Sequence, residues 1–273
     1  GDDTIDASAW TGTSVVSAYS GDDTIVGSAR ADVINPGVGD DVVTGRGGDD
    51  TFRFVGGTDV FRGGKGRDLI DAELVGTLTF TLTDTSASST NAPGTTSLVS
   101  IEDADVHGNT SGDLSIDASG WSRGARLVGG SGDDEVYGGA GNDVLSGRVG
   151  DDAIAGGGGF DVLEYATSAS GTATLTAIQF LDPTWTGVDA FAQIEAGRFF
   201  LLSSMTLDAT AFDRPLTVEG SPYDDVVMGG SGPDLMRGRG GEDTLTGNGG
   251  SDLADGGPEA DYCAAEVEQA CEQ

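Results

Sequence analysis

The sequence predicts an all-β solenoid, in which short parallel strands stack coil upon coil. Two observations lead to this fold class. Aspartates recur every nine residues in three blocks, and the residue two positions after each aspartate is in most cases a large apolar one. Glycines fill the positions between and make up 47 of the 273 residues. A strand of three residues needs one inward apolar side chain, which leaves six residues for a turn, and glycine suits turns because it takes positive φ at little cost.

The periodic aspartates keep one phase inside each block. They are Asp23, Asp32, Asp41, Asp50, Asp59, Asp68, Asp134, Asp143, Asp152, Asp161, Asp225, Asp234, Asp243, Asp252 and Asp261. Around them the sequence follows the pattern G-G-x-G-x-D-x-U-x, where U is apolar, most completely at residues 63–68 and 138–143. The departures are Arg30 for the last glycine of one turn, Phe54 and Val55 for the first glycine pair of another, and the small inward residue Ala254.

Calcium is the ligand that these turns favour. Ca²⁺ prefers carboxylates and other hard oxygen donors, and a glycine backbone leaves its carbonyl oxygens uncovered. Two nonads make a coil of 18 residues, so turns on one side stack ~4.8 Å apart. One aspartate per turn cannot complete a coordination shell, so about nine ions are expected between stacked turns. The expected pairs are Asp23 with Asp41, Asp32 with Asp50, Asp41 with Asp59, Asp50 with Asp68, Asp134 with Asp152, Asp143 with Asp161, Asp225 with Asp243, Asp234 with Asp252, and Asp243 with Asp261.

Glycines of the same turns are expected to complete these metal sites. They are Gly21, Gly39, Gly48, Gly64, Gly66, Gly130, Gly132, Gly139, Gly141, Gly157, Gly159, Gly230 and Gly232. The alternative is that glycine and aspartate serve only as turn residues in a repeat that folds without metal. Turn chemistry alone does not explain how acidic the chain is.

The acidity predicts that metal binding and folding are one event. The chain has 46 acidic against 13 basic residues, a net charge of −33, and only 37% hydrophobic residues. Such a chain repels itself, and its many glycines raise the entropy cost of ordering. About nine Ca²⁺ ions would bring the net charge to about −15 and supply the missing stabilisation. The acidity also argues against nucleic acid as a partner, because there is no basic patch with interleaved aromatic residues.

The segments between the blocks repeat as well. A hexapeptide of the form apolar-Asp-Ala-Ser/Thr-x-aromatic begins 18 residues before each block, at residues 5–10, 116–121 and 207–212. Its aromatic residues, Trp10, Trp121 and Phe212, are expected to pack between segments, with sugar stacking as the alternative. Threonine-alternating stretches at 77–83 and 172–176 are predicted strands with their apolar side inward. They precede the pairs Ile101-Glu102 and Ile194-Glu195.

The nonads resemble those of the RTX, or haemolysin-type, calcium-binding repeat proteins. The resemblance covers the three blocks fully and the connecting coils more loosely. It implies a right-handed parallel β-roll or β-helix whose turns hold calcium through aspartates and backbone carbonyls. It also implies export and folding outside the cell. Family members use such blocks in toxins, proteases and lipases, in adhesins and surface layers, and in enzymes that modify polysaccharides.

The nonad repeat and the longer repeat of the connecting hexapeptide together indicate three modules of one kind. The first, 1–74, is shortened at its start and has nonads at about 18–72. The second, 75–166, has nonads at about 129–164, and the third, 167–273, has nonads at about 220–264. Because residue 1 falls inside a Gly-Asp-Asp turn, we expect a processed piece or a fragment of a longer array. Stacked at 18 residues per coil, the modules would form a rod roughly 70 Å long.

Two cysteines close the chain. Cys263 is on the inward phase after the last periodic aspartate, and Cys271 follows eight residues later. In an exported chain we expect a disulfide between them that closes the tail over the last coil, with two unpaired thiols as the alternative. Two cysteines and one histidine argue against a zinc site.

The leading hypothesis is therefore a secreted, non-enzymatic calcium-binding protein that becomes a stiff rod, as a spacer, adhesin, surface-layer or fibre component. We expect no catalytic residues: its single histidine, His107, is expected in a solvated loop with no nucleophile at readable spacing, and one histidine excludes the histidine pair of a metal hydrolase. No apolar run reaches the ~18 residues of a membrane span. End-to-end self-association is plausible. The alternatives are a polysaccharide-binding module and the calcium-folding C-terminal secretion module of a larger secreted enzyme or toxin.

Overall fold

A computed structural model describes residues 1–109, 111–167, 171–182, 187–269 and 271. All regular elements in these ranges are strands, which confirms the predicted all-β class. None of the described residues belongs to a helix that is long and apolar enough to cross a membrane. The chain divides into two compact units, Gly1–Val144 with Gly157–Gly159, and Leu145–Gly156 with Phe160–Gln273.

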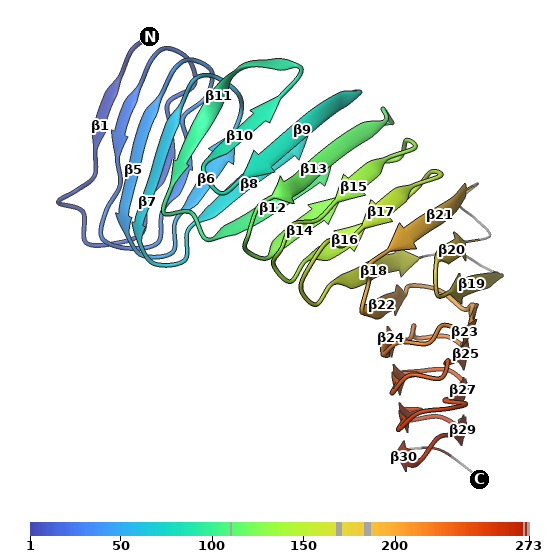
Figure 1. Cartoon of the computed structure of the whole chain (residues 1–273). Helices are drawn as coiled ribbons and strands as arrows, with labels where there is room; N and C mark the ends of the chain where they lie inside the picture. Colours follow the sequence, from blue (N-terminus) through green and yellow to red (C-terminus); the bar gives the residue numbers. More distant parts are fainter. Residues whose placement is uncertain (110, 168–170, 183–186, 270, 272–273) are drawn as a thin grey trace. The chain divides into compact units, whose positions relative to one another are not determined.

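The first unit contains two sheets that the chain visits in turn (Figure 1). One sheet contains β1 (Thr4–Asp6), β3 (Thr24–Val26), β5 (Val42–Gly47), β7 (Val60–Lys65), β9 (Leu78–Thr83), β10 (Ser86–Ser89), β11 (Ala92–Val99), β13 (Leu114–Gly120) and β15 (Glu135–Tyr137). The other contains β2 (Val15–Ser17), β4 (Val33–Asn35), β6 (Thr51–Phe54), β8 (Leu69–Leu74), β12 (Asp103–Gly108) and β14 (Ala125–Val128).

The second unit has the same two-sheet organisation, and β16 (Val144–Ser146) contains the boundary residue. One sheet contains β17 (Ala153–Ala155), β19 (Thr172–Thr176), β20 (Gln179–Asp182), β21 (Gly187–Ala192), β23 (Thr206–Ala211), β25 (Val226–Met228), β27 (Thr244–Thr246) and β29 (Tyr262–Ala264). The other contains β18 (Val162–Thr167), β22 (Ala196–Leu201), β24 (Leu216–Glu219), β26 (Leu235–Arg237), β28 (Leu253–Asp255) and β30 (Val267–Gln269).

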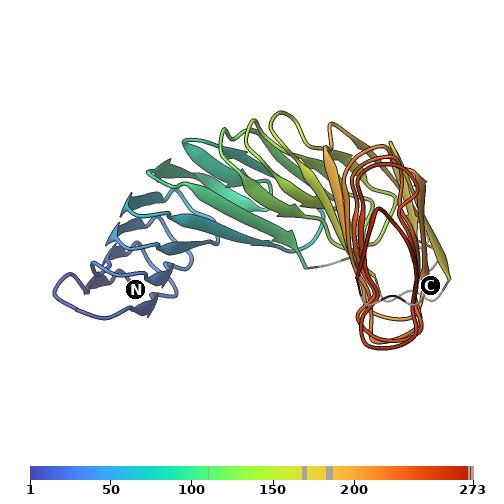
Figure 2. The same ribbon diagram turned by 90° about the horizontal axis from the view of Figure 1, so that it is seen from below.

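The strands of each block pair in parallel with the strand one coil later. In β3 and β5, Ile25 is in register with Val43, and in β25 and β27, Val227 is in register with Leu245. Both separations are 18 residues, as the nonad period predicts. In Figure 2 the last coils, drawn in orange and red, superimpose as one flattened loop with a strand along each long side. The fold is the expected parallel β-roll.

A thin core runs between the two sheets. The residue two positions after every periodic aspartate is buried, from Ile25 in the first coil to Cys263 in the last. Its neighbours on either side point outward, because successive side chains of a strand alternate between faces. Residues from opposite sheets meet inside, and the rings of Phe52 and Phe61 stack with their centroids 5.4 Å apart. The inward apolar residue and the turn aspartate two positions before it therefore have separate roles. The first belongs to the core, and the second is a candidate metal ligand.

Two antiparallel hairpins interrupt the parallel pattern. Strand β10 pairs antiparallel with β9 and β11, and β20 pairs antiparallel with β19 and β21. Each hairpin lengthens its coil: Val60 is in register with Ser97 and Ala153 with Ala190, separations of 37 residues. The threonine-alternating stretches form β9 and β19, as predicted.

The aromatic residues of the connecting hexapeptide lie in different surroundings. Trp121 and Phe212 are fully buried, whereas Trp10 is 61% exposed. Sugar stacking therefore has no access to the rings of Trp121 and Phe212. The expectation for His107 is wrong, because this residue lies on β12, half-buried, with Nδ1 3.9 Å from Asp71 and 3.7 Å from Asp105.

The predicted disulfide is present. Cys263 in β29 is bonded to Cys271, which follows β30, and their Cα atoms are 5.8 Å apart. The bond ties the last described segment to the buried side of the final coil. Closing a loop of this length contributes about 2–3 kcal/mol by restricting the unfolded chain.

Candidate metal centre

The periodic aspartates form hydrogen-bonded ladders along each side of the coils. The backbone amide of one aspartate donates to Oδ1 of the aspartate one coil later, over distances of 2.8–3.0 Å. The pairs joined in this way are Asp23 with Asp41, Asp32 with Asp50, Asp41 with Asp59, Asp50 with Asp68, Asp225 with Asp243, Asp234 with Asp252, and Asp243 with Asp261. The pairs Asp134 with Asp152 and Asp143 with Asp161 remain predictions.

Burial of these carboxylates is nearly complete. All fifteen periodic aspartates are at most 3% exposed. Among the residues that the structure describes, the second carboxylate oxygen, Oδ2, accepts no hydrogen bond in Asp23, Asp41, Asp50, Asp68, Asp243, Asp252 and Asp261. A buried charge without a partner is costly. A cation bound beside these oxygens would supply the missing partner.

A space for that cation lies beside the free oxygen where the first residue of the turn motif is glycine, as it is before Asp50, Asp68, Asp243, Asp252 and Asp261. A Cβ added to Gly45 would lie 2.0 Å from Asp50 Oδ2 and 3.0 Å from the carbonyl oxygen of Gly63, one coil further on. In the second unit, a Cβ on Gly238 would lie 2.0 Å from Asp243 Oδ2 and 2.5 Å from the carbonyl oxygen of Gly256. A carboxylate and a carbonyl oxygen thus face one small space, which is the donor chemistry that Ca²⁺ prefers.

Side chains alone do not complete a coordination shell. In the described ranges, no three His, Cys, Asp or Glu side chains converge closely enough to hold a metal ion. Each stacked pair offers two carboxylates, so the remaining ligands must be backbone carbonyls, as the sequence predicts. The residues present fit a calcium ion bound between turns rather than within one.

Burial also raises the pKa of the ladder carboxylates. Loss of solvent is the main cause for Asp50 and Asp243, whose pKa values rise to about 7, and the negative neighbours in the ladder add to the effect. The pKa values of Asp41, Asp68 and Asp252 are raised for the same main reason. The charged form is therefore disfavoured without a counter-ion, and a bound divalent cation reverses that preference.

With the exception of Asp23, the first aspartate on each side of a block is satisfied by its own turn. Its Oδ2 accepts a hydrogen bond from the backbone amide four residues earlier. This occurs at Asp32, Asp134, Asp143, Asp225 and Asp234, with the amides of Ser28, Gly130, Gly139, Ser221 and Gly230. The residue in register one coil earlier is not acidic: Leu114 precedes Asp134 and Met205 precedes Asp225. The turn thus gives Oδ2 a hydrogen bond where no aspartate precedes.

The glycines expected at the metal sites lie where the turns stack. Most have no room for a side chain: a Cβ would approach the backbone of the preceding coil to 2.7 Å or less at Gly21, Gly39, Gly48, Gly64, Gly66, Gly132, Gly139, Gly141, Gly157, Gly159, Gly230 and Gly232. Gly130 instead donates its amide to Asp134. The sequence analysis overlooked the first glycine of the motif, although it borders the free Oδ2 most closely, as at Gly45, Gly63 and Gly256.

A second, exposed ladder explains the repeated Gly-Asp-Asp. In several turns an aspartate also stands directly before the ligand aspartate, and it accepts a hydrogen bond from the backbone amide one coil later. The amide of Asp40 donates to Asp22, and that of Arg67 donates to Asp49, both at 2.9 Å. These carboxylates face solvent. They tie neighbouring turns together on the outside.

Further acidic residues extend the ladders, and sequence reasoning missed them. The amide of Asp3 donates to Asp23 Oδ1 at 2.6 Å, across 20 residues rather than 18. Glu102, Glu195 and Glu266 accept the amides of the last aspartates on one side. A signal for two of them existed in the sequence, because Glu102 and Glu195 each follow an aspartate by 34 residues.

Comparison with known proteins supports this geometry. Four segments of the chain, residues 17–52, 55–74, 128–163 and 219–262, match the family model of the RTX calcium-binding nonapeptide repeat. Together they contain all fifteen periodic aspartates. No curated protein matches the chain.

Proposed function

Because the chain belongs to the RTX calcium-binding repeat proteins, we propose that it is a secreted structural protein that folds when Ca²⁺ binds between its stacked turns. The observation that carries this proposal is the row of buried Oδ2 oxygens without a hydrogen-bond partner among the described residues. Those of Asp50, Asp68 and Asp243 lie where a glycine leaves a small space beside a carbonyl oxygen. Proteins with this repeat are typically secreted, and calcium is plentiful outside cells.

The proposed ligands are the fifteen periodic aspartates with backbone carbonyls of the turn glycines, and the expected number is about nine ions. When bound, each ion supplies positive charge between two coils that otherwise repel each other. Each coil contacts mainly its neighbours in a solenoid, so calcium between turns would couple the whole stack. The product would be a stiff rod that serves as a spacer, adhesin, surface-layer or fibre component. Its end coils, with unpaired strand edges, favour end-to-end association.

Asp50→Asn is expected to lower the number of bound calcium ions by one or two of about nine, because Asp50 belongs to two stacked pairs and asparagine brings no charge. The amide oxygen can still accept the hydrogen bond from Asp32. Equilibrium dialysis of the whole chain against calcium measures the count. The matched control is Asp49→Asn, which removes the same charge from an exposed neighbour. If both variants lose ions equally, the buried ladder is not the binding site.

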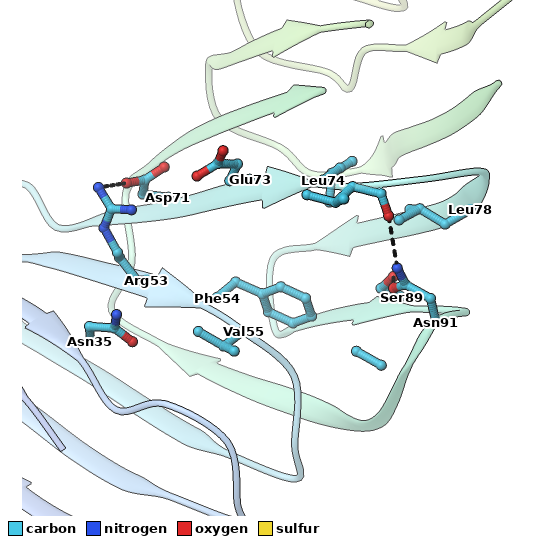
Figure 3. Close-up of a pocket in the computed structure, with 12 residues that line it drawn as sticks. Asn35, Arg53, Phe54, Val55, Asp71, Glu73, Leu74, Leu78, Ser89 and Asn91 are labelled. Carbon is cyan, nitrogen blue, oxygen red and sulfur yellow. Dashed lines mark hydrogen bonds and ion pairs between the residues drawn. The ribbon is translucent and has the colours of Figure 1, made fainter. Parts of the chain in front are cut away.

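A second candidate function, binding of a polysaccharide, has one observation in its favour. A cavity of about 400 Å³ lies in the first unit between Arg53 and Asn91 (Figure 3). The ring of Phe54 borders it, Arg53 pairs with Asp71 at 3.5 Å, and Asn35 Oδ1 is buried without a partner in the described part of the chain. An apolar ring beside amide and guanidinium groups suits a sugar.

A glycan array probed in calcium tests this candidate. We expect Asn35→Ala to reduce binding at least tenfold and Trp10→Ala, which changes an exposed ring outside the cavity, to leave it unchanged. The absence of binding by the unaltered protein would remove the candidate without affecting the calcium sites.

A further inference from the structure

Three glutamates stand at positions where the strand register would place another aspartate. Strands β8 and β12 pair Leu69 with Asp103, which sets Glu102 beside Asp68. Strands β28 and β30 pair Leu253 with Val267, which sets Glu266 beside Asp252. In the same way β18 and β22 set Glu195 beside Asp161.

Each glutamate makes the hydrogen bond that an aspartate makes elsewhere in the ladder. The amide of Asp68 donates to Glu102 Oε2 at 3.1 Å. The amides of Asp252 and Asp161 donate to Oε2 of Glu266 and Glu195, both at 2.8 Å. In the ordinary step, Asp50 donates to Asp68 Oδ1 at 2.9 Å. The glutamate carboxylate therefore occupies the place of the next aspartate.

The turn before Glu102 also supplies a carbonyl oxygen in the ordinary place. A Cβ on Gly63 would lie 2.2 Å from Asp68 Oδ2 and 2.2 Å from the carbonyl oxygen of Ser100. Ser100 adopts φ 53°. Gln193, with φ 54°, repeats this arrangement, because its carbonyl oxygen lies 2.1 Å from a Cβ on Gly156. These turns are shorter than a nonad turn, and the longer glutamate side chain makes up the difference.

A buried carboxylate oxygen faces this space at two of the three ends. Asp68 is 0% exposed and Asp252 is 2% exposed. Within the described residues, Oδ2 of each accepts no hydrogen bond. At Asp68, the glutamate, the carbonyl oxygen of Ser100 and this oxygen make the donor set of an ordinary step. At Asp252, the glutamate and this oxygen take the same places.

The ladders on the other side of the coils end differently. Thr96, which lies in register with Asp59, donates its hydroxyl group to Asp59 Oδ2 at 3.0 Å. Asp189, which lies in register with Asp152, accepts a hydrogen bond from the hydroxyl group of Tyr165 through its own Oδ2. The Thr96 hydroxyl group thus fills the place that stays open beside Asp68 and Asp252, whereas the Tyr165 hydroxyl group binds the added acidic residue Asp189.

We propose that Glu102 and Glu266 each close an additional calcium site beyond the last aspartate of a ladder, whereas Thr96 closes the opposite ladder of the first block without metal. This inference rests on the proposed calcium binding and adds which residues form the last site of a ladder. The two sides of the solenoid then differ in how many ions they carry.

Glu102→Gln and Glu266→Gln in the full chain test the proposal, with bound calcium counted by equilibrium dialysis and native mass spectrometry. Glutamine keeps an oxygen that accepts the aspartate amide, so a purely structural cap would survive the change. We expect each variant to bind one ion fewer than the unaltered chain and the double variant two fewer, with unchanged circular dichroism. Glu266 lies in the final coil, so loss of its site leaves the coils before it intact.

Two controls make the result specific. Glu135→Gln changes an exposed glutamate on β15, and Thr96→Val removes the hydroxyl group of a metal-free end; neither should change the ion count. Glutamine variants that bind as many ions as the unaltered chain would overturn the proposal while leaving the aspartate sites in place. An unaltered chain that binds no calcium would overturn the proposed function as well.

Discussion

Removal of calcium with a chelator is expected to abolish most of the β structure of the chain. The net charge is −33, and the ladder carboxylates are buried with oxygens that have no partner among the described residues. Taking such charges out of water without compensation costs several kcal/mol per ion, whereas the entire stability of a domain is of order 5–15 kcal/mol. A few unfilled sites are therefore enough to unfold the coils. Far-UV circular dichroism before and after chelation measures the change.

Magnesium provides the control for this prediction. Mg²⁺ demands a near-octahedral shell and gives up its water reluctantly, so it should not replace calcium in sites built from backbone carbonyls. Re-addition of calcium should restore the β signal, and the same concentration of magnesium should not. A chain that keeps its full β structure in excess chelator would show that the metal is not part of the folding reaction.

Phe52→Asp is expected to prevent folding at every calcium concentration. Phe52 is fully buried, and its ring stacks on Phe61 in a core only two side chains thick. The new carboxylate would have no cation to bind, because it points inward, away from the turns. Burial of an unpaired charge costs far more than the loss of a contact. The milder change Phe52→Ala should lower the free energy of unfolding by about 3–5 kcal/mol.

The control for this change is Val42→Asp. It places the same charge on an outward position of β5, where the side chain is 39% exposed. That variant should fold in calcium with nearly normal stability, as measured by denaturant titration. Refolding of Phe52→Asp in calcium would mean that the division into inward core and turn ligands is wrong.

The sequence allowed the coil and its register to be predicted because two physical requirements share one period. An inward apolar residue and a turn carboxylate recur together, two positions apart. Each therefore predicts the position of the other, as Asp50 and Phe52 do. The 18-residue pairing then follows from stacking alone, and strands β3 and β5 show it.

Features without the nonad period were harder to predict. The hairpin strands β10 and β20 contain no turn aspartate and reverse direction, so nothing in their pattern distinguishes them from another coil. Asp3 and Glu102 lie in register with ladder aspartates, but at separations of 20 and 34 residues. The length of a turn changes the number of residues between two neighbouring ladder positions, whereas the hydrogen bonds between strands keep these positions side by side. Such ligands emerge only once the strands are paired.

A crystal of the chain grown in calcium, with data collected where the anomalous scattering of calcium is visible, tests the central claim most directly. We expect anomalous peaks beside the buried Oδ2 oxygens of Asp50, Asp68 and Asp243, each between two stacked turns. Peaks confined to the exposed carboxylates of Asp22, Asp40 and Asp49, or no peak beside the buried ladders, would contradict it.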